Sequence, residues 1–302
     1  MRSMTGSLHR KEADVRPSLH RLWLPAAFVL TWSSGAIFVK EGLRYAAPFQ
    51  FLAYRAVFSA LLLWAVLWIL RGSRLEEVAL KRNSAAALLL QVGYQTAFFL
   101  ALMHAVKPGL LAIVLALQPI LTGVIEAQRT KGLDWIGLTL GLAGVVVTVG
   151  SIGDGGVGIG AAWALLALVS LTAGTVLQHR WSGSGNLPLD MAVQYSISAV
   201  VLIAVSLVTD DGGTVWSWPF ITSLAWMVVV VSIGATFLLY FMLKKKDVLS
   251  VSVLFYCVPP VTALFDYLVY GERLSSIQLG GMGMVVCGLA LTLRAVQPIE
   301  TR

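Results

Sequence analysis

The sequence predicts an all-α membrane protein in which ten transmembrane helices form two five-helix repeats inserted in opposite directions. Three observations support this fold class: the composition, the regular succession of apolar runs, and a proline break in each half. Of the 302 residues, 58% are hydrophobic and only 12% are charged, and the mean hydropathy is +0.81. A soluble domain carries about 25% charged residues, so most of this chain is expected to lie in a lipid bilayer.

Ten apolar runs follow one another along the chain, separated by short polar connections. A helix of about 20 apolar residues spans the hydrocarbon core of a bilayer, and each run has about this length. The runs are residues 22–39, 49–70, 85–102, 110–127, 133–150, 157–177, 189–208, 220–243, 248–270 and 277–293. Residues 1–21 and 295–302 flank the runs and are expected to be cytoplasmic tails.

Lys and Arg are distributed unequally between the two sides of the predicted bundle. With the N-terminus in the cytoplasm, 17 of the 22 fall on the inner side and four on the outer side, and Arg55 lies within a span. Cytoplasmic loops carry such an excess, which predicts cytoplasmic N- and C-termini and an even number of spans. The net charge of +7 therefore reflects topology and does not indicate nucleic-acid binding. The predicted location is the plasma membrane, which is the inner membrane of a bacterium.

Glycine spacings recur in the two halves. Gly137 and Gly144 in the fifth run match Gly281 and Gly288 in the tenth. Because each repeat has five spans, an odd number, the second copy must enter from the opposite face. The predicted organisation is a first repeat at 22–150, an extracytoplasmic linker at 151–156 and a second repeat at 157–294. These glycine faces either seat the two runs together or support a homodimer.

Proline interrupts the fourth and the ninth run, at Pro119 and at Pro259 and Pro260. A proline inside a helix frees the carbonyl four residues earlier, and in hydrocarbon that group must find protein, water or a ligand. Breaks at corresponding positions of two halves indicate the central site of a transporter. The three prolines are therefore predicted to act as hinges in alternating access.

Several short features stand at characteristic places in the ten runs. They are the Trp32-Ser33-Ser34-Gly35 motif that leads to Lys40, Arg55 in the second run, Pro119 in the fourth, the Gly271-Glu272-Arg273 turn and the glycines of the tenth run. Together they resemble the drug/metabolite transporter superfamily, and more narrowly the ten-helix EamA-type exporters, which include amino-acid exporters. The resemblance implies a substrate cavity formed by runs one, three, four, six, eight and nine. The counterpart of the Gly-Glu turn in the first half departs from this pattern and reads Gln128-Arg129-Thr130-Lys131.

Polar and aromatic side chains gather on single faces of these runs. Gln91, Tyr94, Gln95 and Phe98 have the i, i+3, i+4, i+7 spacing of one helical face, whose amides need protein or water as partners. The residues predicted to bind substrate are Trp32, Ser33, Gln91, Tyr94, Gln95, Phe98, Gln118, Trp163, Thr175, Gln178, Ser232, Thr236, Tyr240 and Tyr256. The alternative is that these groups only form hydrogen bonds between helices.

The chemistry of these candidates suits a zwitterion with an apolar side chain. Freed carbonyls and glutamine oxygens accept from an ammonium, hydroxyl and amide groups donate to a carboxylate, and aromatic rings line the apolar part. The expected cavity has almost no fixed charge. Arg55 needs an acceptor, for which Asp266 or Glu41 is expected, and Asp266 is alternatively a proton-coupling carboxylate.

Other classes of function lack the residues they need. The glycine-rich segment 153–158 does not follow a strand, no Walker A motif is present and the four histidines form no cluster, so neither a cofactor nor a metal is expected. The sequence therefore predicts a secondary transporter, not an enzyme, that exports small metabolites, foremost amino acids with apolar or aromatic side chains. The alternatives are a multidrug or quaternary-ammonium exporter, although the glutamate expected deep in the first run is missing, and a structural or receptor-like membrane protein. The expected partners are a small-molecule substrate and the lipid bilayer.

Overall fold

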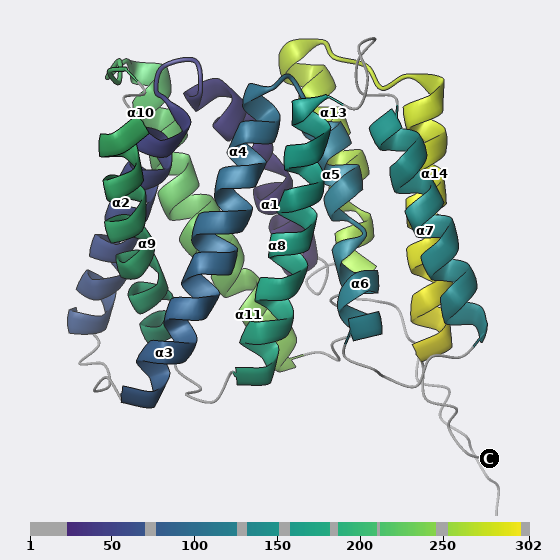
Figure 1. Ribbon diagram of the computed structural model, residues 1–302, viewed down its shortest axis with the longest axis horizontal. Coiled ribbons are helices and arrows are strands. Elements are labelled where there is room, and N and C mark those ends of the chain that lie inside the picture. Colours follow the sequence, from purple (N-terminus) through teal and green to yellow (C-terminus); the bar gives the residue numbers. More distant parts are fainter. Residues whose placement is uncertain are drawn as a thin grey trace, which may run out of the picture.

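The computed structural model describes residues 23–69, 77–125, 132–150, 158–181, 187–209, 212–245 and 253–296. Within these ranges the regular structure is helical and no residue belongs to a strand. The helices lie side by side in one bundle (Figure 1). Helices satisfy all their backbone hydrogen bonds internally, which is the requirement for crossing hydrocarbon.

Five helices of the described residues are long and apolar enough to cross a membrane, and three further apolar helices are shorter. The five are Pro48–Ile69, Asn83–Met103, Ile159–Gln178, Leu187–Thr209 and Trp218–Leu239, and the shorter three are Pro108–Thr122, Trp135–Thr148 and Ser276–Leu291. Large apolar side chains cover the outside of the bundle, with Trp68 and Val208 each 84% exposed. A surface of this kind is suited to lipid and not to water. The chain is thus a multi-pass membrane protein.

The described residues form sixteen helical elements. Those of the first half are α1 (Trp23–Gly42), α2 (Pro48–Ile69), α3 (Glu77–Ala86), η2 (Ala87–Tyr94), α4 (Gln95–Met103), α5 (Pro108–Leu115), α6 (Gln118–Ile125) and α7 (Gly132–Gly150). Those of the second half are α8 (Ile159–Trp181), α9 (Leu187–Thr209), α10 (Trp218–Ala225), η3 (Trp226–Ala235), α11 (Thr236–Lys245), η4 (Val253–Tyr256), α13 (Val258–Tyr270) and α14 (Ser276–Val296).

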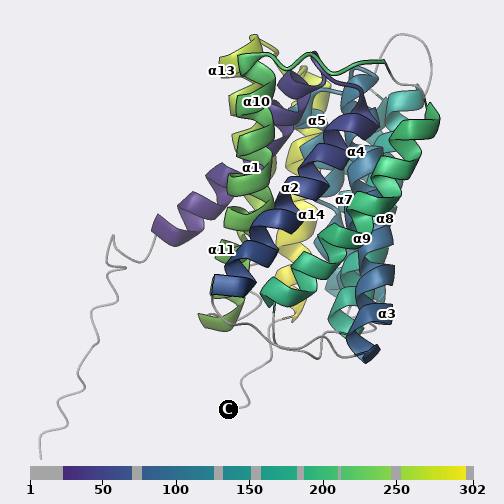
Figure 2. The same cartoon turned by 90° about the vertical axis from the view of Figure 1, so that its left-hand side faces the viewer.

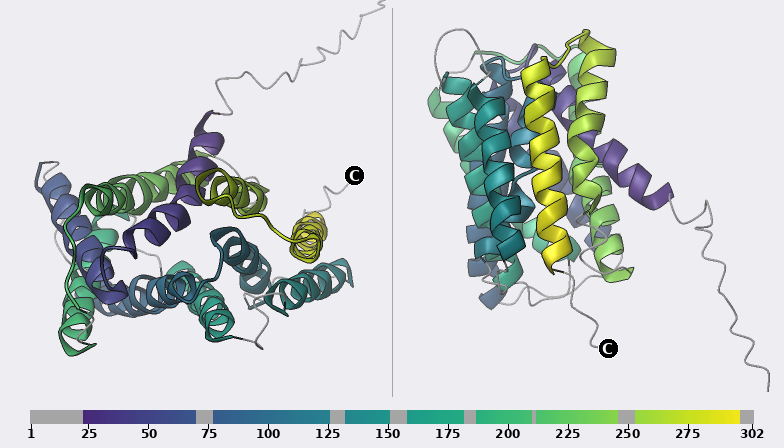
Figure 3. Two further views of the ribbon diagram at one scale, coloured as in Figure 1. Left: turned by 90° about the horizontal axis from the view of Figure 1, so that it is seen from above. Right: turned by 90° about the vertical axis from the view of Figure 1, so that its right-hand side faces the viewer.

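Helices that correspond in the two halves have corresponding neighbours. At the two ends of the long axis, α2 packs along α9 and α7 packs along α14 (Figures 1 and 3). Between these pairs, α1 contacts α13 and the segment η3, while α8 contacts α5, α6 and the segment η2. In Figure 1, α2 descends where α9 rises, and α7 rises where α14 descends. The first turns of α1 project from the bundle (Figure 2).

Within the described ranges, four connecting segments lie at the end of the bundle that is uppermost in Figure 1, called the upper end below. They are residues 43–47, 104–107, 212–217 and 271–275. The amide of Val215 donates to the carbonyl of Tyr45 at 2.8 Å, and Lys107 Nζ donates to the carbonyl of Arg273 at 3.3 Å. Each of these bonds joins the first half of the chain to the second.

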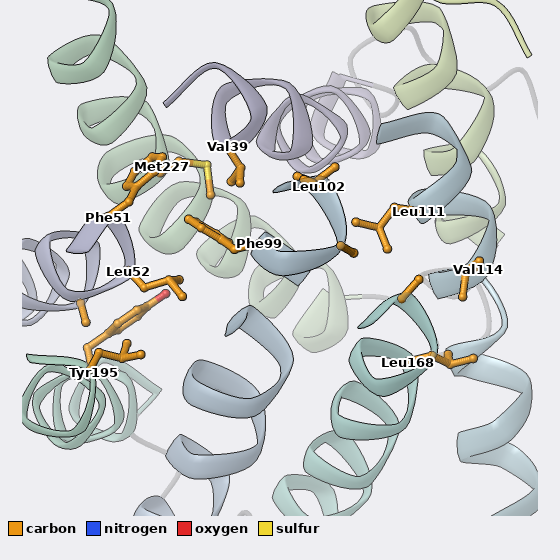
Figure 4. Close-up of a cluster of buried hydrophobic side chains, with 14 of the residues drawn as sticks. Val39, Phe51, Leu52, Phe99, Leu102, Leu111, Val114, Leu168, Tyr195 and Met227 are labelled. Atoms are coloured by element: carbon orange, nitrogen blue, oxygen red, sulfur yellow. The ribbon is translucent and has the colours of Figure 1, made fainter. Parts of the chain in front are cut away.

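Buried side chains from several helices form the central apolar core (Figure 4). Phe51 of α2 packs edge to face on Phe99 of α4 and on Phe220 of α10, with ring centroids 5.2 and 5.4 Å apart. All three rings are fully buried. Edge-to-face pairs at these distances are favourable beyond the area they bury. This core fixes α2 and α4, which carry cavity residues, against the second half.

Both predicted proline breaks are present as interruptions of helical structure. Residues 116–117 separate α5 from α6, where the amide of Leu117 bonds the carbonyl of Val114 at 3.3 Å. Cys257 separates the short 3-10 helix η4 from α13, which carries Pro259 and Pro260 in its first turn. Proline is favourable in a first turn because the missing amide has no helical acceptor there.

The third and eighth runs each contain a π-helix that the sequence did not predict. The π-helix η2 interrupts the third run at Ala87–Tyr94, and η3 interrupts the eighth at Trp226–Ala235. Wider helical turns of this kind are rare and are found frequently at functional sites. Each segment carries residues that face the cavity described below.

Glycines bring α7 and α14 into backbone contact. A Cβ atom at Gly144 would lie 2.7 Å from the carbonyl oxygen of Gly281, and one at Gly288 would lie 2.5 Å from the carbonyl oxygen of Gly137. A Cβ atom at Gly280 or Gly283 would meet nothing within 4 Å. Two roles were expected for these glycines. The contacts of Gly137, Gly144, Gly281 and Gly288 support the first role, which is to seat the fifth and tenth runs together.

The Gly288→Ala substitution is expected to lower the free energy of unfolding by about 1–3 kcal/mol, because overpacking forces two backbones apart. Gly283→Ala is the matched control on the same helix, and it is expected to leave stability equal or higher, since alanine is the better helix former. The measurement is thermal unfolding of the purified protein in detergent. Equal melting temperatures of the two variants would contradict the assigned contact.

Candidate functional site

A cavity of about 480 Å³ lies between the two halves. Its walls come from α1, α2, η2, α4 and α5 of the first half and from α8, α9, η3, α11 and α13 of the second. It extends from Pro108, the first residue of α5 at the upper end, to Leu187, the first residue of α9 at the opposite end. Its volume lies in the usual range of small-molecule sites, about 300–1,000 Å³.

Most of the side chains predicted to bind substrate come together in this cavity. The lining residues among them are Trp32, Ser33, Gln91, Tyr94, Gln95, Phe98, Thr175, Gln178, Ser232 and Thr236. The face formed by Gln91, Tyr94 and Gln95 points into the cavity and not toward lipid. Their role in binding stays a prediction, since a lining position shows access to a substrate and not contact with one.

Two predicted residues lie away from the cavity walls. Gln118 donates its amide to Thr122 Oγ1 at 3.0 Å, one turn further along α6, and this local bond occupies it. Trp163 of α8 is half-buried against the apolar core and does not line the cavity. The side chains of Tyr240 and Tyr256 lie outside the described residues.

Aromatic rings line the site from α1 and from the run formed by η2 and α4. Trp32 packs on Phe28 and Phe255 with ring centroids 5.4 and 6.0 Å away, and Tyr94 packs on Phe98 at 5.8 Å. Next to Trp32, Ser33 Oγ donates to the carbonyl of Val258, at the start of α13, over 3.4 Å. The second proline break thus adjoins the cavity, whereas Gln118 at the first does not line it.

Helix α9 contributes a set of polar residues that the sequence analysis missed. Asp190, Gln194 and Tyr195 line the cavity, although the resemblance implied no wall from the seventh run. Asn83 of α3 donates to Asp190 Oδ1 at 2.8 Å and accepts from Gln194 at 3.1 Å. The i, i+4 spacing of Asp190 and Gln194 near the start of an apolar run was the available signal, because polar groups within a span face protein or water.

The expectation of an almost uncharged cavity with an ion-paired Arg55 is wrong. Arg55 lines the cavity and is 4% exposed. Its Nε donates to Ser232 Oγ at 2.9 Å and its Nη1 donates to Gln95 Oε1 at 2.8 Å. The two acids expected as partners are bonded elsewhere: Asp266 to Lys40 and Glu41 to Arg44. The guanidinium therefore stands among neutral acceptors.

A cluster of four charges lies at the upper end of the bundle, next to the cavity. Lys40 Nζ lies 3.5 Å from Asp266 Oδ1 and 2.7 Å from Glu272 Oε1, and Lys107 Nζ lies 3.6 Å from Glu272 Oε2. The amide of Gly109 donates to Asp266 at 3.5 Å, next to the lining residue Pro108. We call these four charged residues the upper ion cluster.

The charges of the upper ion cluster stabilise one another. Burial raises the pKa of the Glu272 carboxyl, but the hydrogen bond and charge of Lys40, together with Lys107, outweigh burial and lower that pKa below its ordinary value. Asp266 is 2% exposed and therefore depends on Lys40 as its counterion. The ion-pair role expected for Asp266 thus has a geometric basis, with Lys40 in place of Arg55.

The described residues contain no group of three His, Cys, Asp or Glu side chains that could hold a metal ion. Within the described ranges, the chemistry available to the cavity consists of amide, hydroxyl, aromatic and guanidinium groups with one carboxylate, Asp190. These groups can recognise a small polar or zwitterionic molecule by hydrogen bonds and ring contacts.

Comparison with known proteins identifies relatives of the whole chain. Residues 22–150 and 158–294 each match the EamA-like transporter family. The uncharacterized transporter YvbV of Bacillus subtilis is 26% identical over 289 residues, which cover 91% of this chain and 92% of that protein. The uncharacterized inner membrane transporter YedA of Escherichia coli K12 is 24% identical, with 88% of each chain covered. A crystal structure at 18% identity covers 93% of this chain and 99% of the other with a TM-score of 0.63, which shows a shared fold.

Proposed function

The chain belongs to the EamA-like transporter family, and we propose that it is a secondary transporter that exports amino acids with apolar or aromatic side chains. The observation that carries this substrate class is the cavity, in which the rings of Trp32, Tyr94 and Phe98 stand beside glutamine amides and Arg55. Rings accommodate an apolar side chain, while amides and the guanidinium suit the polar end of an amino acid.

Alternating access by two inverted five-helix repeats is part of the same proposal. The opposite courses of α2 and α9, and of α7 and α14, support inverted repeats (Figure 1). Inverted repeats with a site at their interface are the usual basis of alternating access. We place the protein in the plasma membrane with both termini in the cytoplasm, because the excess of Lys and Arg then lies inside.

Uptake into proteoliposomes tests this function. Purified protein is expected to give saturable uptake of labelled phenylalanine and methionine above protein-free vesicles, measured with and without a pH gradient. Ala112→Trp places a large ring in the cavity and is expected to abolish uptake, whereas Ala162→Trp on the exposed side of α8 is the matched control. Uptake equal to protein-free vesicles for every apolar amino acid would contradict the proposal.

Proton coupling through Asp266 is a separate part of the proposal. A carboxylate that lies in a span next to the cavity can exchange a proton during transport. Uptake is then expected to respond to a pH gradient in the wild type and to lose that response in Asp266→Asn. Transport that ignores the gradient in both proteins would remove this role.

The quaternary-ammonium exporter is the less favoured alternative. Arg55 places a fixed positive charge in the cavity wall, which repels a substrate that is a permanent cation. Competition by tetraphenylphosphonium against labelled phenylalanine in the same vesicles distinguishes the two substrate classes.

A further inference from the structure

Arg55 lies deep inside the bundle. It is the eighth residue of α2, so the helical rise of 1.5 Å per residue places its Cα about 10 Å from the start of that helix. The side chain is 4% exposed and faces the cavity. An ionisable residue at such depth is costly and generally marks a binding or transport path.

The charge of this guanidinium is not neutralised by the part of the protein that the structure describes. Among these residues, no carboxylate lies within 4.0 Å of Arg55, and its two hydrogen bonds go to Ser232 and Gln95. Asp190, the carboxylate of the cavity wall, accepts a hydrogen bond from Asn83 at 2.8 Å. A buried cation that bonds only to neutral acceptors is incompletely compensated, and a bound anion would stabilise it.

The two bonds also leave part of the guanidinium available. Arginine has five N–H donors in a planar fork, and the bonds to Ser232 and Gln95 use one on Nε and one on Nη1. The remaining donors are on Nη1 and Nη2. Two parallel N–H bonds from such a fork match the two oxygens of a carboxylate.

The partners of Arg55 hold the fork from both halves of the chain. Ser232 belongs to the π-helix η3, and Gln95 follows the π-helix η2 directly. Since one partner fixes Nε and the other fixes Nη1, the plane of the guanidinium is set before a ligand arrives. A preorganised donor pair binds more tightly because less side-chain freedom is lost on binding.

We propose that Arg55 is the residue that binds the carboxylate of the substrate. This assignment rests on the proposed transport function and narrows its substrates to small molecules that carry a carboxylate next to an apolar or aromatic group. Tyr94 and Phe98 flank Gln95 on the same helical run and provide rings for the apolar group. The assignment gives the buried charge a ligand and explains why no acid among the described residues pairs with it.

Binding to the purified protein in detergent tests this role independently of transport. Phenylalanine and phenylalaninamide share the ring and the ammonium but differ in the carboxylate, and Trp32 in the cavity wall provides a fluorescence signal. The wild type is expected to bind phenylalanine at least about tenfold more tightly than the amide, the size of a charge-assisted bidentate contact. In Arg55→Gln the two affinities are expected to converge.

Two further variants keep the result interpretable. Arg55→Lys keeps the charge but loses the fork, so an intermediate preference is expected, and it serves where Arg55→Gln does not fold. Arg44→Gln removes a positive charge from the surface of the upper end, where Arg44 is 58% exposed, and is expected to keep the preference of the wild type.

The outcomes separate this inference from the function it rests on. A wild type that binds phenylalanine no better than its amide, or binds neither, overturns the role of Arg55 even where vesicles show uptake. A preference that Arg55→Gln and Arg55→Lys both retain overturns it as well. Carboxylate preference that depends on Arg55, without uptake in vesicles, supports the site and contradicts transport.

Discussion

Replacing Lys40 by methionine is expected to lower the free energy of unfolding by about 3 kcal/mol, because removing one partner of a buried ion pair leaves the other charge uncompensated. Asp266 is 2% exposed and Lys40 is its counterion at 3.5 Å. The amide of Gly109 also donates to Asp266, at 3.5 Å, but a neutral donor at that distance compensates little of the charge. The same substitution removes Lys40 from Glu272 as well, but Glu272 retains Lys107 as a partner at 3.6 Å.

A double-mutant cycle measures this coupling directly. The double variant Lys40→Met, Asp266→Leu replaces the pair by apolar groups and is expected to recover most of the loss, since such replacements are often neutral. Lys107→Met is the matched control, because Lys107 is 37% exposed and exposed pairs contribute about 1 kcal/mol or less. The readout is the apparent melting temperature of the purified protein in detergent.

Two results would overturn the importance of this pair. One is a melting temperature of Lys40→Met equal to that of Lys107→Met. The other is a double variant whose loss of stability equals the sum of the losses in Lys40→Met and Asp266→Leu, which would show that the two charges do not depend on each other.

Which residues lie on a shared helical face could be predicted from the sequence alone. Apolar runs of membrane-spanning length, proline spacing and the polar face of Gln91, Tyr94 and Gln95 depend on local periodicity, which a single sequence records. The structure places that face in the cavity. The resemblance to the EamA family is confirmed by the match of residues 22–150 and 158–294 to the EamA-like transporter family.

Which helices meet could not be predicted in the same way. Arg55 bonds to Ser232, a residue 177 positions away, and no spacing along the chain reveals that partner. Asp190 and Gln194 were missed because the packing of α9 against η2 and α3 turns their side of the helix toward the cavity. The π-helices were missed because their residues have the same apolar character as those of an α-helix, and tertiary packing decides the turn.

The glycines of α7 and α14 show what the sequence could predict and what it could not. The recurrence of Gly137 and Gly144 as Gly281 and Gly288 is visible in the sequence, and it indicated a packing surface. The partner surface became known only from the coordinates, where these glycines face each other across α7 and α14. Gly280 and Gly283 look equivalent in the sequence, yet they lie on the other side of α14 with open space around them.

Replacing the interrupting prolines by alanine is expected to slow transport at least about tenfold. Alanine at position 119 restores an amide that can bond the carbonyl of Leu115, and it removes the cost of about 3 kcal/mol that a proline adds inside a continuous helix. If the bundle must bend at residues 116–117 in each cycle, a straighter α5 and α6 opposes that step. The measurement is the maximal rate and the apparent affinity for phenylalanine uptake in proteoliposomes.

The two breaks are expected to differ in their effect on affinity. Pro119 lies beside Gln118, which does not line the cavity, so Pro119→Ala is expected to change the rate with little change in affinity. The double variant Pro259→Ala, Pro260→Ala reshapes the start of α13, where Val258 lines the cavity and accepts from Ser33, so both rate and affinity are expected to fall.

Pro219→Ala is the control for proline content. Pro219 stands in the first turn of α10, where no helical carbonyl waits for an amide, so its replacement is expected to leave transport unchanged. Maximal rates equal to the wild type in both Pro119→Ala and the double variant would contradict the hinge. Equal losses of affinity in the two would instead show that the breaks shape the cavity together, and that the first break acts on the substrate through α5, although Gln118 does not line the cavity.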